Sequence, residues 1–230
     1  MYECTRGVKV PRSVRTRLLE LLESIQWKSK REAVTTSARK IGKYAEGSHS
    51  LVLGATRGAA GSAGFGRVIK DPVHGSQIGI NTQVVPRKFD SSREALLELW
   101  QICKKMLKVA EPGFSFSSIQ VNKNFYGSPH VDKHDVTHQY ALSLGNFTGG
   151  RLVTGTDDPR TFVSFDTHDV LTKCDGRNPH WVTPYKGARY SLIFYRITGR
   201  KTPRNSASRS GVCGKLVPSA RAAPRRAQIK

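Results

Sequence analysis

A histidine and an aspartate two positions apart, His130 and Asp132, are the strongest candidates in the chain for binding a metal ion. In an extended segment, side chains two positions apart leave the backbone on the same face, so both can reach one ion. A third ligand must come from elsewhere in the fold, and His180, fifty residues further along, is the candidate. Two neutral imidazoles and one carboxylate form the facial triad of non-haem iron(II) sites, which leaves coordination positions open. The His-x-Asp pair alone is a weak signal, because most such tripeptides are structural or lie on surfaces.

The segment after His180 strengthens this interpretation. Arg189 and Ser191 stand two positions apart in a run with the composition of a β-strand. In a strand they would share one face with Ile193 and Tyr195. A guanidinium binds a carboxylate through two parallel hydrogen bonds, and the serine hydroxyl can add a third. We therefore predict a pocket for the distal carboxylate of 2-oxoglutarate, the alternative being an arginine on the surface of a strand.

Short runs of β-forming residues surround these candidates and are expected to position them. The runs are Phe114–Val121, Tyr140–Leu144, Arg151–Thr154, Thr161–Phe165, Trp181–Val182 and Tyr190–Ile197. A helix precedes them, with Ser91 and Glu94 as a capping box, an apolar face at helical spacing and an end near Ala110. A helix followed by many short strands predicts an α+β fold with a jelly-roll core braced by helices.

By composition the chain divides into three parts: a basic arm over residues 1–50, a folded domain over 51–198 and a basic tail over 199–230. Apolar residues at helical spacing predict one amphipathic helix in the arm, from Ser13 to Trp27, with Ser13 as its N-cap. The glycine-rich stretch 54–66 lacks the lysine and hydroxyl of a phosphate-binding loop, so we expect a flexible loop there. The tail has no acidic and no aromatic residue, and we expect it to be disordered.

The charge of the chain is its most unusual property. Thirty-eight Lys and Arg against seventeen Asp and Glu give a net charge of +21. Such a field attracts polyanions, and nucleic acid is the commonest of these, although a basic surface can also serve solubility alone. No run is apolar enough for a membrane span or a secretory signal, and the four cysteines show no paired spacing. We expect an intracellular protein with reduced thiols, and nuclear residence from the basic ends.

Taken together, the motifs resemble those of the 2-oxoglutarate/iron(II) dioxygenase superfamily, whose fold is a double-stranded β-helix. More narrowly, Gln120–Asn124 and Leu144–Leu152 are similar to segments of the TET/JBP branch, the oxygenases of nucleic-acid bases. His180–Pro184 leading into Gly187–Leu192 fits the same pattern. The resemblance covers about residues 91–198. The cysteine-rich zinc module of the vertebrate enzymes has no counterpart here.

The resemblance implies a role for each matching residue. His130, Asp132 and His180 would bind Fe(II), while Arg189 and Ser191 would hold 2-oxoglutarate, the co-substrate used with dioxygen. The catalytic set would be His130, Asp132, His180 and Arg189. Ascorbate is a candidate reductant.

The resemblance also implies contacts with a nucleobase. Asp135 matches a residue that touches the flipped base, its alternative being a solvated aspartate in a turn. Tyr195 matches an aromatic residue that stacks on the base, its alternative being a core tyrosine. Asn122 shares one face of its strand with Asn124 and is assigned to the co-substrate site. Ile197 replaces the histidine that methylcytosine oxidisers generally carry, so thymine stays open as a substrate.

The function expected from these features is oxidation of a methylated pyrimidine, 5-methylcytosine or thymine, to its hydroxymethyl form in DNA. A base within a duplex cannot reach a buried metal, so it must be flipped out of the stack. Two rivals keep the same residues: a prolyl-type protein hydroxylase, and an inactive module that only binds nucleic acid. A zinc hydrolase is a third reading of the two histidines and the aspartate, and it leaves Arg189 and Ser191 unexplained.

Overall fold

The structure is a computed structural model of the chain. It describes residues 2–4, 7–27, 48–57, 63–64, 67–70, 77–80, 90–156, 158, 160–202 and 217–218, with side chains placed in 7–27, 48–55, 94–156, 158 and 160–202. Ser91 of the predicted capping box and most of the glycine-rich stretch 54–66 lie outside the residues whose side chains are described. So does the predicted tail beyond Thr202, apart from the backbone of 217–218.

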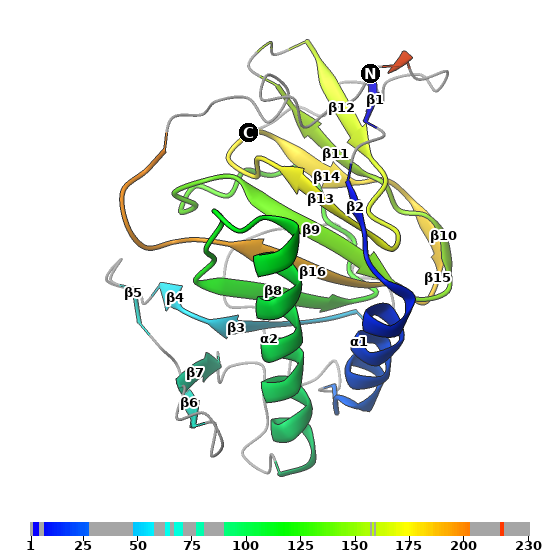
Figure 1. The fold of residues 1–230 in the computed structure, drawn as a ribbon. Coiled ribbons are helices and arrows are strands. Elements are labelled where there is room, and N and C mark those ends of the chain that lie inside the picture. The colour runs from blue at the N-terminus through cyan, green and yellow to red at the C-terminus, as the bar shows by residue number, and fades with distance from the viewer. Residues whose placement is uncertain are drawn as a thin grey trace.

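Two helices and seventeen strands make up the described chain (Figure 1). The helices are α1 (Arg12–Ser24) and α2 (Asp90–Ala110). The strands up to α2 are β1 (Tyr2–Cys4), β2 (Val8–Lys9), β3 (His49–Gly54), β4 (Thr56–Arg57), β5 (Ala63–Gly64), β6 (Arg67–Lys70) and β7 (Gln77–Ile80). Those after it are β8 (Ser118–Lys123), β9 (Gln139–Leu144), β10 (Phe147–Gly149), β11 (Leu152–Gly155), β12 (Phe162–Phe165), β13 (Val170–Cys174), β14 (His180–Val182), β15 (Tyr185–Gly187), β16 (Tyr190–Tyr195) and β17 (Val217–Pro218).

The strands form two main sheets. The larger has the order β2-β13-β9-β16-β8-β3-β7-β6, and the smaller has the order β14-β11-β12-β1-β17. All pairings are antiparallel except that of β1 with β12. Between the sheets lies a small apolar cluster of Ala141, Leu152, Val163, Phe165 and Cys174, which comes from strands of both. The predicted α+β jelly-roll fold with bracing helices is therefore confirmed.

The central strand β16 separates an apolar face from one that carries Ser191. Tyr190, Leu192 and Phe194 belong to the main core, while Ser191 points to the opposite side, as the predicted alternation requires. The main core packs this face against both helices, and Figure 1 shows α2 across β8, β9 and β16. The opposite face of β16 is therefore the one that carries the polar side chain of Ser191.

The N-terminal helix differs from the prediction at both ends. It begins at Arg12, with Pro11 at the cap position and no side-chain cap, so Ser13 is not the N-cap. The fixed φ of proline suits entry into a helix, which makes a capping hydroxyl unnecessary here. The helix ends at Ser24, and Trp27 lies beyond it and donates from Nε1 to the Leu22 carbonyl over 3.1 Å.

The segment 7–27, within the predicted N-terminal arm, packs against the rest of the fold. The apolar face of α1, which includes Leu18 and Leu22 at 0% exposure, belongs to the main core, and β2 pairs with β13. An apolar face of this kind must be covered, and α2 and the sheet cover it. Among the described residues, no helix is long and apolar enough to cross a membrane.

The predicted strands are confirmed to within a few residues, and several were missed. Predicted Phe114–Val121 forms a strand only from Ser118, because residues 114–117 lead into it as irregular chain. The strands β13 and β15 were not predicted: each is short and contains polar residues that give no clear alternation. Their pairing with β9 and β10 stabilises them, which is a tertiary effect.

Candidate metal centre and anion pocket

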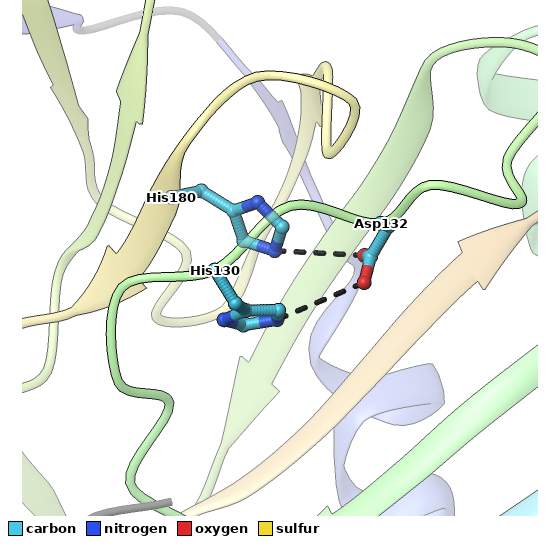
Figure 2. A group of neighbouring side chains, drawn as sticks. All are labelled: His130, Asp132 and His180. Atoms are coloured by element: carbon cyan, nitrogen blue, oxygen red, sulfur yellow. Dashed lines mark ion pairs between the residues drawn. The ribbon is translucent and has the colours of Figure 1, made fainter. Parts of the chain in front are cut away.

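The three predicted metal ligands lie together although they come from distant parts of the chain (Figure 2). His130 and Asp132 belong to the loop between β8 and β9, and His180 is the first residue of β14. Residues 130 and 180 form an antiparallel bridge in which each main-chain N–H donates to the carbonyl of the other, over 3.0 and 2.9 Å. This bridge places the two imidazoles side by side, with ring centroids 4.2 Å apart.

The donor atoms of the triad converge on one point. Asp132 presents one carboxylate oxygen to each histidine, at 3.7 Å from His130 Nε2 and 3.5 Å from His180 Nε2. One ligand atom from each of the three residues can be chosen so that all lie within 4.8 Å of one another. Separations of this size between donors suit a single ion at about 2 Å from each.

The main chain fixes which nitrogen of each ring faces that point. His130 Nδ1 lies 2.6 Å from the Ser128 carbonyl, and His180 Nδ1 lies 3.0 Å from the Asn178 carbonyl. A carbonyl only accepts, so each Nδ1 carries the proton and each Nε2 keeps its lone pair for a metal. The predicted triad therefore has the orientation that a metal site requires.

A buried amide stands behind the aspartate of the triad. Gln139 Nε2 donates to Asp132 Oδ2 over 2.9 Å and to Asp135 Oδ2 over 3.0 Å. Asp135 is only 4% exposed, so it is not the solvated turn residue of the alternative reading. The pKa of Asp135 is raised to about 8. Burial is the largest cause, and the neighbouring carboxylates of Asp132 and Asp175 act in the same direction.

An ion pair closes the loop that leads to His180. Arg177 donates from Nη2 and Nε to the two carboxylate oxygens of Asp175 over 2.6 and 2.8 Å, and both side chains are buried. Arg177 Nη1 also donates to the carbonyl of Thr202 over 2.7 Å. This bidentate pair holds the turn before β14 in one shape and joins residues 199–202 to the core.

The predicted anion pocket centres on Arg189, which is 3% exposed. Its Nη2 donates to Ser143 Oγ over 2.7 Å, and its guanidinium lies 5.5 Å from the ring centroids of both Phe147 and Tyr185. Burial lowers the pKa of Arg189 to about 10, which still leaves it charged at neutral pH. The Arg189 Nε and the Tyr185 hydroxyl are buried and have no hydrogen-bond partner among the described residues.

Glycine at position 150 allows the arginine to pack this closely. A Cβ on Gly150 would lie 3.0 Å from Arg189 Nε and 3.2 Å from Tyr185 Cβ, and its φ of +67° disfavours any side chain. Gly150, directly after β10, thus forms part of one wall of the pocket.

A row of polar side chains crosses three strands beside the arginine. Register places Ser191 of β16 opposite Asn122 of β8 on one side and Ser143 of β9 on the other. Asn122 Nδ2 donates to Ser191 Oγ over 3.2 Å, and Ser143 Oγ lies 2.9 Å from Thr167 Oγ1. The structure therefore brings the predicted co-substrate residues Asn122, Arg189 and Ser191 into one buried polar group.

Three further histidines are not part of the triad. His134 is exposed. His138 packs beside Phe114, and burial lowers its pKa to about 4. His168 stacks on Phe147 with centroids 4.1 Å apart and accordingly forms part of the wall of the arginine pocket.

Two positions that the resemblance compares with base-contacting residues lie on or just beyond β16. Tyr195 is half-buried and shares the strand face of Ser191, and Ile197 is 6% exposed. Trp181 packs against Phe162 with ring centroids 5.2 Å apart.

Sequence reasoning missed four residues that shape the site: Gln139, Ser143, Phe147 and Tyr185. The first two carried a signal, because polar residues alternate with Tyr140, Leu142 and Leu144 along the same predicted strand. Alternation of this kind indicates a strand with one polar face. The two aromatic residues carried none, because nothing local distinguishes them from core residues.

Comparison with known proteins gives only distant neighbours. No protein-family model matches the chain, and no curated protein matches its sequence. Among solved structures, a 2OG-Fe(II) oxygenase family oxidoreductase from Burkholderia pseudomallei is 19% identical over 59% of this chain and 75% of its own, with a TM-score of 0.39. NgTET1 in complex with 5mC DNA is 17% identical over 84% of this chain and 71% of its own, with a TM-score of 0.45. At these values neither neighbour identifies the chemistry of this chain.

Proposed function

We propose that the chain is an iron(II)- and 2-oxoglutarate-dependent oxygenase, with the ion held by His130, Asp132 and His180. The observation that carries the proposal is the convergence of two Nε2 lone pairs and one carboxylate, with both Nδ1 atoms bound to main-chain carbonyls. A facial set of this kind is the characteristic arrangement for non-haem iron(II) and leaves positions open for a chelating ligand and dioxygen.

The arginine pocket favours an oxygenase over a zinc hydrolase. Arg189 is a buried cation whose Nε has no partner among the described residues, so an anionic ligand would stabilise it. A zinc site made of the same three ligands does not account for such an anion. The distal carboxylate of 2-oxoglutarate supplies one, with Arg189 and Ser191 as its partners and Asn122 supporting Ser191. The Tyr185 hydroxyl is a further free donor beside the same guanidinium.

The protein would position the reactants and keep their charges in place. Bound iron would activate dioxygen, with 2-oxoglutarate as the source of two electrons and succinate and carbon dioxide as its products. The Nδ1 bonds to main-chain carbonyls would fix the tautomer of both imidazoles and leave Nε2 of each as the metal-binding atom. Arg189 would orient the co-substrate by its charge in a site closed to water by Phe147 and Tyr185.

For the substrate we propose a methylated pyrimidine in DNA, 5-methylcytosine or thymine, which becomes the hydroxymethyl base. The net charge of +21 supports a polyanionic partner, and phosphate contacts would offset the few kcal/mol that flipping a base costs. Tyr195, half-buried on the strand face of Ser191, is the candidate to stack on the base. Nuclear residence belongs to this proposal too, through the basic ends of the chain.

Mass spectrometry of nucleosides tests the proposal directly. Purified protein is incubated with iron(II), ascorbate, 2-oxoglutarate and DNA that contains either 5-methylcytosine or only thymine as its methylated pyrimidine. We expect a hydroxymethyl base from one of the two, and none with His130→Ala or Asp132→Ala. Succinate formation without any modified base would keep the oxygenase and reject the DNA substrate.

The rival readings give different results in two simple assays. A prolyl-type protein hydroxylase should not show DNA binding that weakens steeply with salt, whereas a nucleic-acid oxygenase should. A module without catalytic activity should fail to bind iron(II) in a titration, although it could still bind DNA.

A further inference from the structure

The amide of Gln139 is the one side-chain donor shown on the carboxylate of Asp132 among the described residues. It has two hydrogens on a single nitrogen, and the structure directs that nitrogen to two carboxylates at once, Asp132 at 2.9 Å and Asp135 at 3.0 Å. An amide oxygen in the same place would face an oxygen of the Asp132 carboxylate, which only accepts, so this orientation of the amide is the favourable one. Gln139 is 3% exposed and Asp135 is 4% exposed, so water does not compete for these bonds.

The neighbouring loop leaves space for this amide and for nothing larger. A Cβ on Gly176 would lie 1.5 Å from Gln139 Nε2 and 3.0 Å from Asp132 Oδ2. The Gly176 carbonyl also accepts from the main-chain N–H of Asp132 over 2.8 Å. The backbone at Gly176 and the side chain at Gln139 therefore hold Asp132 from two directions.

We propose that Gln139 is a positioning residue for the metal centre, which fixes the rotation of the Asp132 carboxylate, and that Asp135 anchors Gln139. The inference rests on the metal site of the proposed function. The terminal torsion of an aspartate is broad, so a carboxylate without a partner would turn among many orientations. A hydrogen bond to Oδ2 limits that rotation before the ion arrives, and partners of this kind change metal affinity by about 10- to 100-fold.

The same contacts give Asp135 a different role from the one the resemblance implied. Its carboxylate accepts from Gln139, and its main-chain N–H donates to the Asp132 carbonyl over 3.3 Å. Both bonds point toward the metal loop. Asp135 thus supports the loop and the amide, in place of a contact with a flipped base.

Cobalt(II) titration of the metal-free full chain, followed by the visible absorption of the bound ion, tests the proposal. Gln139→Met removes the donor at nearly constant volume, and we expect cobalt to bind about 10- to 100-fold more weakly. Gly176→Ala displaces the amide without altering it and should have an effect in the same range. Asp135→Leu removes the acceptor for Gln139 and should also weaken cobalt binding, whereas Asp135→Asn keeps an acceptor oxygen and should stay within about threefold of the wild type.

A matched control separates positioning from a general loss of stability. Gln120→Met makes the same substitution on β8, where the amide donates to Ser50 Oγ, to the Leu51 carbonyl over 3.3 Å and to Asn122 Oδ1 over 3.2 Å, and none of these partners is a residue of the triad. Its cobalt affinity should equal that of the wild type. Excess metal should restore the cobalt spectrum of Gln139→Met, which would not happen if the variant were unfolded.

The outcomes distinguish the inference from the proposed function. If the wild type does not bind cobalt, the metal site itself is wrong. Circular dichroism shows which of the two variants, Gln139→Met and Gly176→Ala, are folded. If the wild type binds cobalt and a folded variant binds it within threefold of the wild type, the positioning role is overturned. Wild-type affinity in folded Asp135→Leu would overturn the anchoring role alone.

Discussion

The metal end and the arginine end of the site are built in different ways. The metal ligands come from a loop and from the start of a short strand, and the side chains of His130 and Asp132 are 29% and 25% exposed. Arg189 is 3% exposed and stands at the start of a central strand, with its partners set by sheet register. The accessible end suits a large substrate that must reach the ion, whereas the closed end suits a small dicarboxylate held by charge.

The difference means that the two ends should fail separately. A change at the metal end should alter metal affinity first, and a change at the arginine end should alter co-substrate affinity while the metal still binds. The predictions below test this separation, beginning with the largest effect.

Removal of one metal ligand should produce the largest loss. His180→Ala should lower metal affinity by more than about 100-fold. Loss of a hydrogen-bond partner of a ligand costs about 10- to 100-fold in affinity, and loss of the ligand itself should cost more. The bridge between residues 130 and 180 uses main-chain atoms alone, so the fold should survive the substitution. Isothermal titration with manganese(II) measures the affinity, and circular dichroism checks the fold. A variant that keeps wild-type affinity would remove His180 from the metal site.

Loss of the buried cation should weaken co-substrate binding next. Arg189→Met should raise the Kd of 2-oxoglutarate, measured in the presence of metal, by about 30-fold or more, which corresponds to about 2 kcal/mol. Metal affinity without co-substrate should not change, because the Arg189 guanidinium bonds to Ser143 and lies beside Phe147 and Tyr185, none of which belongs to the triad. Equal losses of metal and co-substrate affinity would contradict the separation of the two ends.

The sequence predicted the metal end better than its surroundings. His130, Asp132 and His180 could be chosen because few residue types bind metals and their spacing is distinctive. Gln139 and Gly176 could not, since their importance lies in a contact across a turn that forms only in the folded chain. The jelly roll was predictable from many short strands, whereas β13 and β15 depend on their partners for their structure.

The N-terminal segment is the clearest case of a tertiary effect that the sequence concealed. Its composition is that of a basic arm, yet Arg15 of α1 forms an ion pair with Asp169. The main-chain N–H of Val10 also donates to the Asp169 carbonyl over 3.0 Å. Composition gave no indication of the partner, because that partner lies more than 150 positions away. The arm thus braces the loop that carries Thr167 and His168 beside the arginine pocket.

A smaller effect should follow when that brace is cut. Arg15→Gln should raise the KM for 2-oxoglutarate by about two- to fivefold with kcat unchanged, since partly exposed ion pairs contribute up to about 1 kcal/mol. Arg17→Gln is the matched control on the same helix, because Arg17 pairs with Glu98 and Glu20 on the exposed surface. Initial rates at varied co-substrate concentration measure both. An equal change in the two variants would mean that the brace to Asp169 has no specific role.

The last effect concerns acid stability, and it comes from His138, which directly precedes β9. Burial lowers the pKa of His138 to about 4, well below its ordinary value of 6.5. Between these values the unfolded chain binds more protons than the folded chain, so this group makes stability fall as the pH falls from about 6.5 toward 4. Replacing His138 with Leu removes that dependence while the contact with Phe114 and Tyr140 is largely kept. After allowance for the partly exposed ring, the variant should gain about 1 kcal/mol relative to wild type between pH 7 and pH 5. Urea unfolding at the two pH values measures the difference. If the wild type and the His138→Leu variant lose the same free energy of unfolding between pH 7 and pH 5, His138 does not cause the acid sensitivity. Another group would then be responsible for it.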